Sequence, residues 1–159
     1  MRIGVVSDTH NHLPNVGRIV ELLNGAGVER IVHTGDITQA KTLDALAALR
    51  APLVGVYGNN DVEREALGAA AARHGFALAE SGLELALGGR RIVVVHDPRE
   101  LAGRSDFDLA LHGHTHRLTV EREVNRLVFN PGECAGHLAG HNTVGIVDLR
   151  DLEVELLRF

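Results

Sequence analysis

The chain has 159 residues, of which 45% are apolar and 23% are charged, so it is long enough for one domain with a core that folds unaided. It is too short for two full domains, and we expect a single domain over residues 1–159. The formal net charge is −5, with acidic and basic residues interspersed, which argues against a long nucleic-acid track or an anionic membrane surface as a partner.

Targeting and redox signals are few. The first residues form a short apolar run that meets Asp8 at once, so we expect neither a signal peptide nor a membrane span. The single cysteine, Cys134, excludes an internal disulfide and suits a reducing compartment. These features predict a cytoplasmic protein with no membrane partner.

Strand and helix patterns alternate in the first half. Apolar, β-branched runs that end at polar clusters predict buried strands at 2–7, 30–34 and 53–56. Helical spacing and propensity predict helices from Pro14 to Gly25, around Leu43 to Ala47, and from Val62 to His74. This order indicates parallel strands joined by right-handed crossovers, whose carboxyl ends collect ligands.

The second half has the pattern of short strands and tight turns. It predicts hairpins that pair 83–87 with 90–95, 118–124 with 127–130, and 143–149 with 152–157, besides a strand at 109–111. We therefore expect this half to be mostly antiparallel. Because no repeat or linker separates the halves, their two sheets should pack together, with helices on the outer faces.

Five polar clusters each follow a predicted strand. They are Asp8-Thr9-His10, Gly35-Asp36, Gly58-Asn59-Asn60-Asp61, His96-Asp97 and Gly113-His114-Thr115-His116. Carboxylate oxygens and imidazole nitrogens together suit Mn, Fe, Zn, Ni or Mg, whereas the missing cysteine cluster argues against a structural zinc site. On an extended segment, alternate side chains point the same way, so Asp8 with His10, and His114 with His116, could each serve one centre.

Each cluster alone has an ordinary structural explanation. Gly, Asn and Asp are common turn residues because they tolerate left-handed backbone, and a lone histidine is more often hydrogen-bonded than metal-bound. The joint occurrence is what favours a metal site. Independent turns have no reason to place these residue types in this order, each directly after an apolar strand.

In this order the clusters match the motifs D-x-H, G-D, G-N-x-D, an isolated H, and G-H-x-H over nearly the whole chain. The chain thereby resembles the calcineurin-like metallophosphoesterase superfamily, and in particular its small bacterial and archaeal single-domain phosphodiesterases. The resemblance implies an α/β fold, a four-layer αββα sandwich of two mixed β-sheets flanked by helices.

The resemblance also implies two divalent metal ions. One would be bound by Asp8, His10, Asp36 and His116, and the other by Asp36, Asn59, His96 and His114, with Asp36 as the bridge. Two such ions would generate a hydroxide that attacks phosphorus, while Asp36, Asn59 and His96 contribute to catalysis by positioning metal and phosphate. We expect manganese, with nickel, iron, zinc or magnesium as alternatives, and a small phosphoester as substrate. Relatives of this kind often form homodimers or larger oligomers.

Three positions depart from the family pattern. Asn60 stands where many members have a histidine, and an amide cannot protonate a leaving group at neutral pH; by position alone, His33 and His12 are the other candidates, although a structural role fits both better. Glu133, in Asn130-Pro131-Gly132-Glu133, replaces a serine and would repel a phosphate. Asp97 replaces a glycine and is expected to be a turn residue, or else to orient a ligand histidine.

The remaining candidates receive structural interpretations. We expect Asp61 to hold the loop at 58–61 or a ligand histidine, and Arg64 to be an exposed helix residue rather than a phosphate contact. No metal role is expected for His74, His112, His137 and His141.

Two other functions remain open from the sequence. The same fold occurs in a retromer scaffold subunit that works by binding partners, but a scaffold is expected to lose several ligands, and this chain offers seven. A nuclease acting on short nucleic acids is the other alternative. The negative charge and the 3% aromatic content give it little support.

Overall fold

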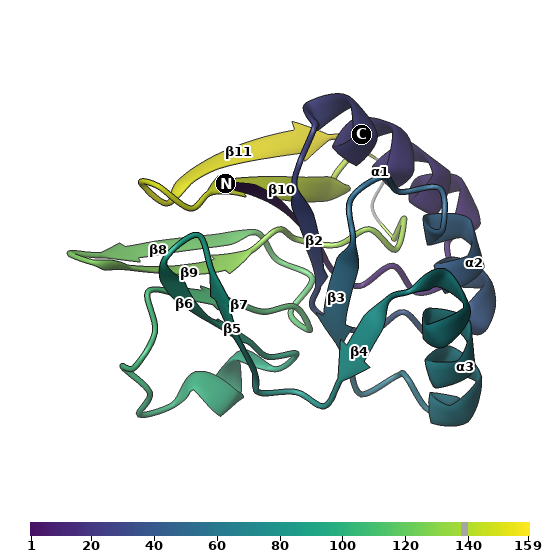
Figure 1. Ribbon diagram of the computed structural model, residues 1–159, viewed down its shortest axis with the longest axis horizontal. Coiled ribbons are helices and arrows are strands. Elements are labelled where there is room, and N and C mark those ends of the chain that lie inside the picture. Colours follow the sequence, from purple (N-terminus) through teal and green to yellow (C-terminus); the bar gives the residue numbers. More distant parts are fainter. Residues whose placement is uncertain (138–139) are drawn as a thin grey trace.

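Two β-sheets pack face to face, and three helices cover one of them (Figure 1). The computed structural model describes residues 1–137 and 140–159. The helices are α1 (Leu13–Ala26), α2 (Ala40–Leu46) and α3 (Arg64–His74). Among the described residues, no helix has the length and apolar character needed to cross a bilayer.

The first sheet has six strands in the order β11-β10-β1-β2-β3-β4. Their bounds are Glu153–Arg158, Thr143–Asp148, Arg2–Val6, Arg30–His33, Leu53–Val56 and Ala77–Ala79. Strands β1 to β4 run parallel to one another, whereas β10 pairs antiparallel with both β1 and β11. The parallel strands predicted for the first half are therefore present, with β4 as an unpredicted edge strand.

The second sheet has five strands in the order β5-β6-β7-β9-β8. Their bounds are Leu83–Leu87, Arg90–Val94, Leu109–Leu111, Arg126–Asn130 and Thr119–Glu123. The predicted hairpins β5-β6 and β8-β9 are antiparallel, but β6, β7 and β9 run parallel. The third predicted hairpin, β10-β11, joins the first sheet instead. Both sheets are therefore mixed, and the expected α/β fold class is confirmed.

Side-chain alternation along the strands separates two main cores. Val6, Ile31 and Ile146 face the helices and pack against α1 residues such as Ile19. Their neighbours on the strands, such as Ile3, Val5 and Val32, face the other way and pack against second-sheet residues that include Leu109 and Phe129. The layers are thus helices, first sheet and second sheet, in that order (Figure 1).

The outer face of the second sheet has a thinner cover. Val93, Val95 and Ala110 pack there against Phe107, which follows the short 3-10 helix Pro98–Leu101. All three α-helices lie on the opposite side of the molecule (Figure 1). The fourth layer is therefore a 3-10 helix and a loop, both in the connection from β6 to β7.

Candidate metal centre

The predicted site residues follow the carboxyl ends of parallel strands in both sheets. Asp8, His10, Asp36 and Asn59 follow β1, β2 and β3 of the first sheet. His96, His114 and His116 follow β6 and β7 of the second sheet. Because the two sheets pack face to face, these strand ends meet and the side chains converge.

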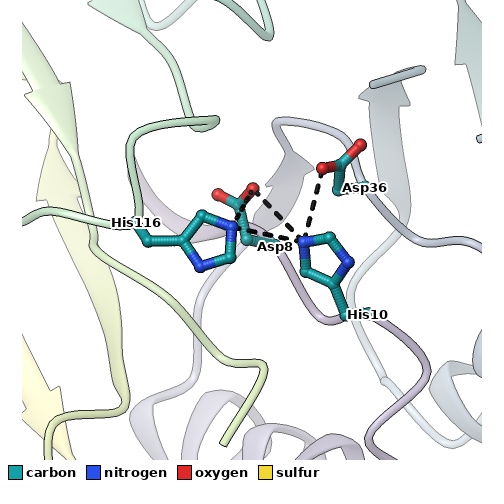
Figure 2. Close-up of side chains that lie close together, drawn as sticks. All are labelled: Asp8, His10, Asp36 and His116. Carbon is teal, nitrogen blue, oxygen red and sulfur yellow. Dashed lines mark hydrogen bonds and ion pairs between the residues drawn. The ribbon is translucent and has the colours of Figure 1, made fainter. Parts of the chain in front are cut away.

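Four of the seven side chains form what we call the first donor group: Asp8, His10, Asp36 and His116 (Figure 2). The Nε2 atoms of His10 and His116 are 3.3 Å apart. Asp8 Oδ1 lies 3.4 Å from His116 Nε2, and Asp36 Oδ2 lies 3.3 Å from His10 Nε2. All four side chains therefore aim at one small volume.

Asn59, His96 and His114, together with Asp36, form the second donor group. Asn59 Oδ1 lies 3.0 Å from His96 Nε2 and 2.9 Å from His114 Nδ1. The other carboxylate oxygen of Asp36, Oδ1, lies 3.5 Å from His96 Nε2. Asp36 thus presents one oxygen to each group, which is the geometry that a bridging ligand needs.

The backbone brings these residues together in a way that the alternation argument did not foresee. Asp8, His10, Asp36, His114 and His116 all have positive φ, between 41° and 66°. The expectation of extended segments at 8–10 and 114–116 is therefore wrong, and His114 and His116 point into different donor groups. Five non-glycine residues with left-handed backbone in one site indicate local strain that the surrounding structure maintains.

Two carboxylates of the site have contrasting electrostatics. Burial raises the pKa of Asp8, and the hydrogen bond from Ser7 offsets only part of that effect. Burial also acts to raise the pKa of Asp36, but the neighbouring His96 ring and the two hydrogen bonds donated by Asn60 outweigh it, so this pKa lies well below the ordinary value. Asp36 is therefore an anion at neutral pH, and a bound cation would favour the anion of Asp8 as well.

Hydrogen bonds outside the donor groups set the histidine tautomers. His96 Nδ1 donates to Thr34 O at 2.8 Å, and His116 Nδ1 donates to Glu133 Oε2 at 2.7 Å. In each ring this leaves the unprotonated Nε2 facing carboxylate or amide oxygens. Lone pairs that face one another without protons between them suit a cation. The residues present therefore fit divalent metal ions.

The loop at 58–61 is fastened to the loop of Asp36. Asp61 accepts hydrogen bonds from the backbone N–H groups of Asp36, Thr38 and Gly58, at 3.0, 2.6 and 2.7 Å. Asp61 thus holds the loop, the first of its two expected roles. Asn60 donates to Asp36 from its backbone N–H at 2.9 Å and from its side-chain amide at 2.7 Å. Asn60 therefore orients the carboxylate that lies between the donor groups.

Glu133 and His137 extend the site beyond the predicted residues. Glu133 is buried, and its Oε2 lies 2.7 Å from His116 Nδ1 and 3.1 Å from His137 Nδ1. The His137 ring stacks on that of His116, with 5.4 Å between centroids. The structural interpretation of His137 missed this contact, which joins residues far apart in the sequence. The sequence offered one signal for Glu133. It follows strand β9, which runs parallel to β7, so it lies at the same end of the sheet as the histidines that follow β7.

Other candidates lie outside the donor groups. His33 is fully buried beside Thr9, and burial lowers its pKa to about 3, so it cannot donate a proton at neutral pH. His12 accepts a hydrogen bond from the backbone N–H of Asn15 and caps α1. His112 is buried against Asn130 and Gly113. The structural roles expected for these three histidines are confirmed.

Asp97 and Arg64 also have structural roles. Asp97 caps the 3-10 helix Pro98–Leu101 in a capping box, and its carboxylate is 3.8 Å from His114 Nε2, too far for a hydrogen bond. Arg64 is exposed, pairs with Glu80 and lies over the Tyr57 ring. Asp97 is therefore a turn residue and Arg64 an exposed helix residue, as expected from the sequence.

Comparison with known proteins agrees with this geometry. Residues 1–152 match the model of the calcineurin-like phosphoesterase superfamily domain. The chain belongs to this superfamily. Phosphodiesterase MJ0936 of Methanocaldococcus jannaschii is 33% identical to the chain, over 96% of each protein. Phosphodiesterase YfcE of Escherichia coli is 26% identical, over 83% of the chain and 78% of the relative.

Solved structures of this superfamily fold show the same architecture. A structure described as a novel archaeal phosphodiesterase covers all of both chains with a TM-score of 0.88 and 33% identity. A Vps29 of Entamoeba histolytica has a TM-score of 0.68 at 20% identity, covering 100% of this chain and 99% of the other. The second likeness concerns the fold alone.

Proposed function

We propose that the chain is a metal-dependent phosphodiesterase that hydrolyses small phosphoesters at the two donor groups. The observation that supports this most directly is the position of Asp36, whose two carboxylate oxygens face the two groups separately. The phosphodiesterases MJ0936 and YfcE are similar to the chain over most of its length. The native metal proposed is manganese, with nickel, iron, zinc or magnesium as alternatives.

The proposed roles follow from the contacts. Asp8, His10, Asp36 and His116 would hold one ion, and Asp36, Asn59, His96 and His114 the other. Two divalent cations, when bound, would supply Lewis acidity toward phosphoryl oxygens and lower the pKa of a water molecule so that it becomes the nucleophile. Asn60 and Asp61 keep the Asp36 loop in place, while Glu133 and the Thr34 carbonyl hold His116 and His96 in the required tautomers.

The scaffold alternative is less consistent with the site. A scaffold needs no buried carboxylate beside unprotonated imidazoles, an arrangement that is costly without a cation. Here Asp8 is fully buried, and the seven donors converge in two groups from both sheets. The nuclease alternative would need a cationic track, but the net charge is −5. We therefore place the substrate among small phosphodiesters, including short nucleotides.

We also propose that the protein works in the cytoplasm. The free thiol of Cys134 is buried and hydrogen-bonded to the Thr143 carbonyl, and burial raises its pKa, so it is an inert thiol suited to a reducing compartment. Self-association into a homodimer or a larger oligomer stays a prediction from the resemblance.

Purified protein is expected to hydrolyse bis(p-nitrophenyl) phosphate only when a transition metal is retained or added, manganese being the first to test. The donor groups consist of carboxylates, imidazoles and an amide whose donor atoms face one another, as metal ligands do. Rates would be measured beside metal content, before and after chelation and after adding the metal back. Full activity in protein confirmed to be metal-free would overturn the proposed function.

A second expected result concerns the leaving group. Asn60 cannot supply a proton, and the buried His33 has a pKa of about 3, so neither can protonate the departing oxygen at neutral pH. We expect kcat/KM to fall steeply as the pKa of the leaving alcohol or phenol rises. A series of aryl and alkyl diesters of similar size measures this slope. A flat dependence, with chemistry shown to be rate-limiting, would mean that another acid is present.

Glu133→Gln is expected to weaken metal binding at the first donor group by roughly 10- to 100-fold, because second partners of ligand histidines have effects of this size. The amide cannot accept the His116 Nδ1 proton as strongly as the carboxylate that now lies 2.7 Å away. Competition with a chromogenic chelator measures the affinity. Glu123→Gln is the matched control, since Glu123 pairs with Arg126 on an exposed hairpin. Equal metal affinity in both variants would exclude this role of Glu133.

A further inference from the structure

A cavity of about 290 Å³ lies beside the first donor group. His116 belongs both to the donor group and to the wall of this cavity. The rest of the wall includes Arg117, which follows His116, and Arg158, at the end of β11, together with His141. The wall of a cavity that borders the candidate metal centre thus includes two arginines. A cavity of this size can admit one polar group with its connecting atoms.

The two arginines of this cavity differ from most others in the chain. Ten arginines form ion pairs with carboxylates among the described residues. Arg117 and Arg158 pair with no described carboxylate, and both are exposed. Their charges are therefore available to a ligand. A guanidinium offers a planar fork of donors that matches phosphate and carboxylate oxygens.

Arginines in two other cavities are already neutralised. In the cavity beside the second donor group, Arg64 pairs with Glu80, and Arg99 pairs with Asp97. In the cavity on the outer face of the second sheet, Arg91 pairs with Asp108, and Arg104 pairs with Glu84. The cavity beside the first donor group is therefore the better site for an additional anion.

One carboxylate, that of Glu133, also lines the cavity. Its Oε2 lies 2.7 Å from His116 Nδ1 and 3.1 Å from His137 Nδ1, so its charge is directed at imidazole N–H groups. It is 5% exposed, whereas the two arginines are exposed. The accessible charge of the wall is thus that of Arg117 and Arg158.

We infer that this cavity binds a second anionic group of the substrate, a phosphate or a carboxylate other than the phosphoryl group that is hydrolysed. The inference rests on the proposed function, because His116 ties the cavity to the donor groups where hydrolysis would occur. Arg117 and Arg158 are then specificity residues. Anionic contact away from the reacting phosphorus supplies binding energy that a substrate without the second anionic group cannot obtain.

Three p-nitrophenyl phosphodiesters test this assignment. Their other ester group is a three-carbon chain that ends in a hydroxyl, a carboxylate or a phosphate. With metal-loaded protein, kcat/KM for the ester that ends in a carboxylate or a phosphate is expected to exceed that for the hydroxyl-terminated ester by roughly 10- to 100-fold, the size of one or two charge-assisted hydrogen bonds. The difference should lie mainly in KM. Comparing the carboxylate with the phosphate shows which anion the cavity prefers.

Arg117→Gln with Arg158→Gln is expected to remove this advantage, so that the three values of kcat/KM lie within about twofold of one another, because the two cations that favour the second anionic group are gone. Arg50→Gln is the matched control, because Arg50 is exposed, pairs with no described carboxylate and lies outside the cavity. Equal kcat/KM for all three esters in the unmodified protein would overturn the inference. So would an anionic advantage that survives in the double variant.

A binding measurement separates this inference from the proposed function. Calorimetry on metal-loaded protein compares propane-1,3-diyl bisphosphate with 3-hydroxypropyl phosphate, and the bisphosphate is expected to bind at least tenfold tighter unless both arginines are replaced. If this holds while no ester is hydrolysed, the cavity is an anion site and the proposed function is wrong. If the two compounds bind equally, the inference is wrong whether or not the protein is active.

Discussion

Asp36→Asn is expected to lower kcat by roughly 10³-fold, corresponding to about 4 kcal/mol of transition-state stabilisation, and to reduce the metal content from two ions per chain. Asp36 is the residue whose two carboxylate oxygens face different donor groups, at 3.3 Å from His10 Nε2 and 3.5 Å from His96 Nε2. The substitution preserves shape but removes the charge that both ions would share. Other donors face one group each, so single replacements there should cost less.

The measurement pairs kinetics with metal analysis on the same preparations. Asp44→Asn is the control, because Asp44 lies on α2 and pairs with Arg73 and His74 at the surface. Retention of both ions and near-normal turnover in Asp36→Asn would refute the bridging role. Loss of one ion without loss of activity would show that a single occupied group suffices.

Gly58→Ala is expected to lower activity by about 10²-fold or more, since misplacement of catalytic groups by 1 Å can have an effect of this size. An added Cβ would lie 2.2 Å from Asp36 Oδ1 and 2.8 Å from His96 Cε1. Neither neighbour can yield without leaving its donor group. Such overpacking also destabilises a fold by about 1–3 kcal/mol.

Gly68→Ala is the matched control for this prediction. Gly68 lies inside α3, and the nearest atom to an added Cβ would be Tyr57 Oη at 3.6 Å, an ordinary contact. Because alanine favours the helix, we expect this variant to be about 0.5–1 kcal/mol more stable, with activity unchanged. Urea unfolding and steady-state rates on both variants make the comparison. Equal activity in Gly58→Ala and Gly68→Ala would mean that the loop at 58–61 can shift without consequence.

The sequence was sufficient to predict the elements that bear the site. Each donor cluster follows an apolar run, and runs of this kind form the buried strands β1, β2, β3, β6 and β7. Strand β4 was missed because Ala77–Ala79 has only three residues and none of them is buried. So short a segment shows no alternation of apolar and polar side chains. The 3-10 helix was missed although Asp97, Pro98 and Glu100 form a readable N-terminal signal.

What the sequence could not show depends on long-range contacts. Strand β10 pairs with β1 across almost the whole chain, so the last hairpin joins the first sheet, and no local pattern distinguishes this from the second sheet. Likewise His33 and His96 both end apolar strands, yet only His96 reaches a donor group. The glycine of the loop at 58–61 was attributed to turn geometry, whereas the structure requires it for close approach to Asp36.

Both donor groups draw their ligands from both sheets. The first combines Asp8, His10 and Asp36 with His116, and the second combines Asp36 and Asn59 with His96 and His114. Bound ions would therefore act as cross-links at one end of the interface between the sheets. Since an ion that binds only the folded chain adds about 2.7 kcal/mol of stability at 100 times its dissociation constant, metal supply and the lifetime of the fold become coupled. A cell short of the metal would then lose folded protein as well as activity.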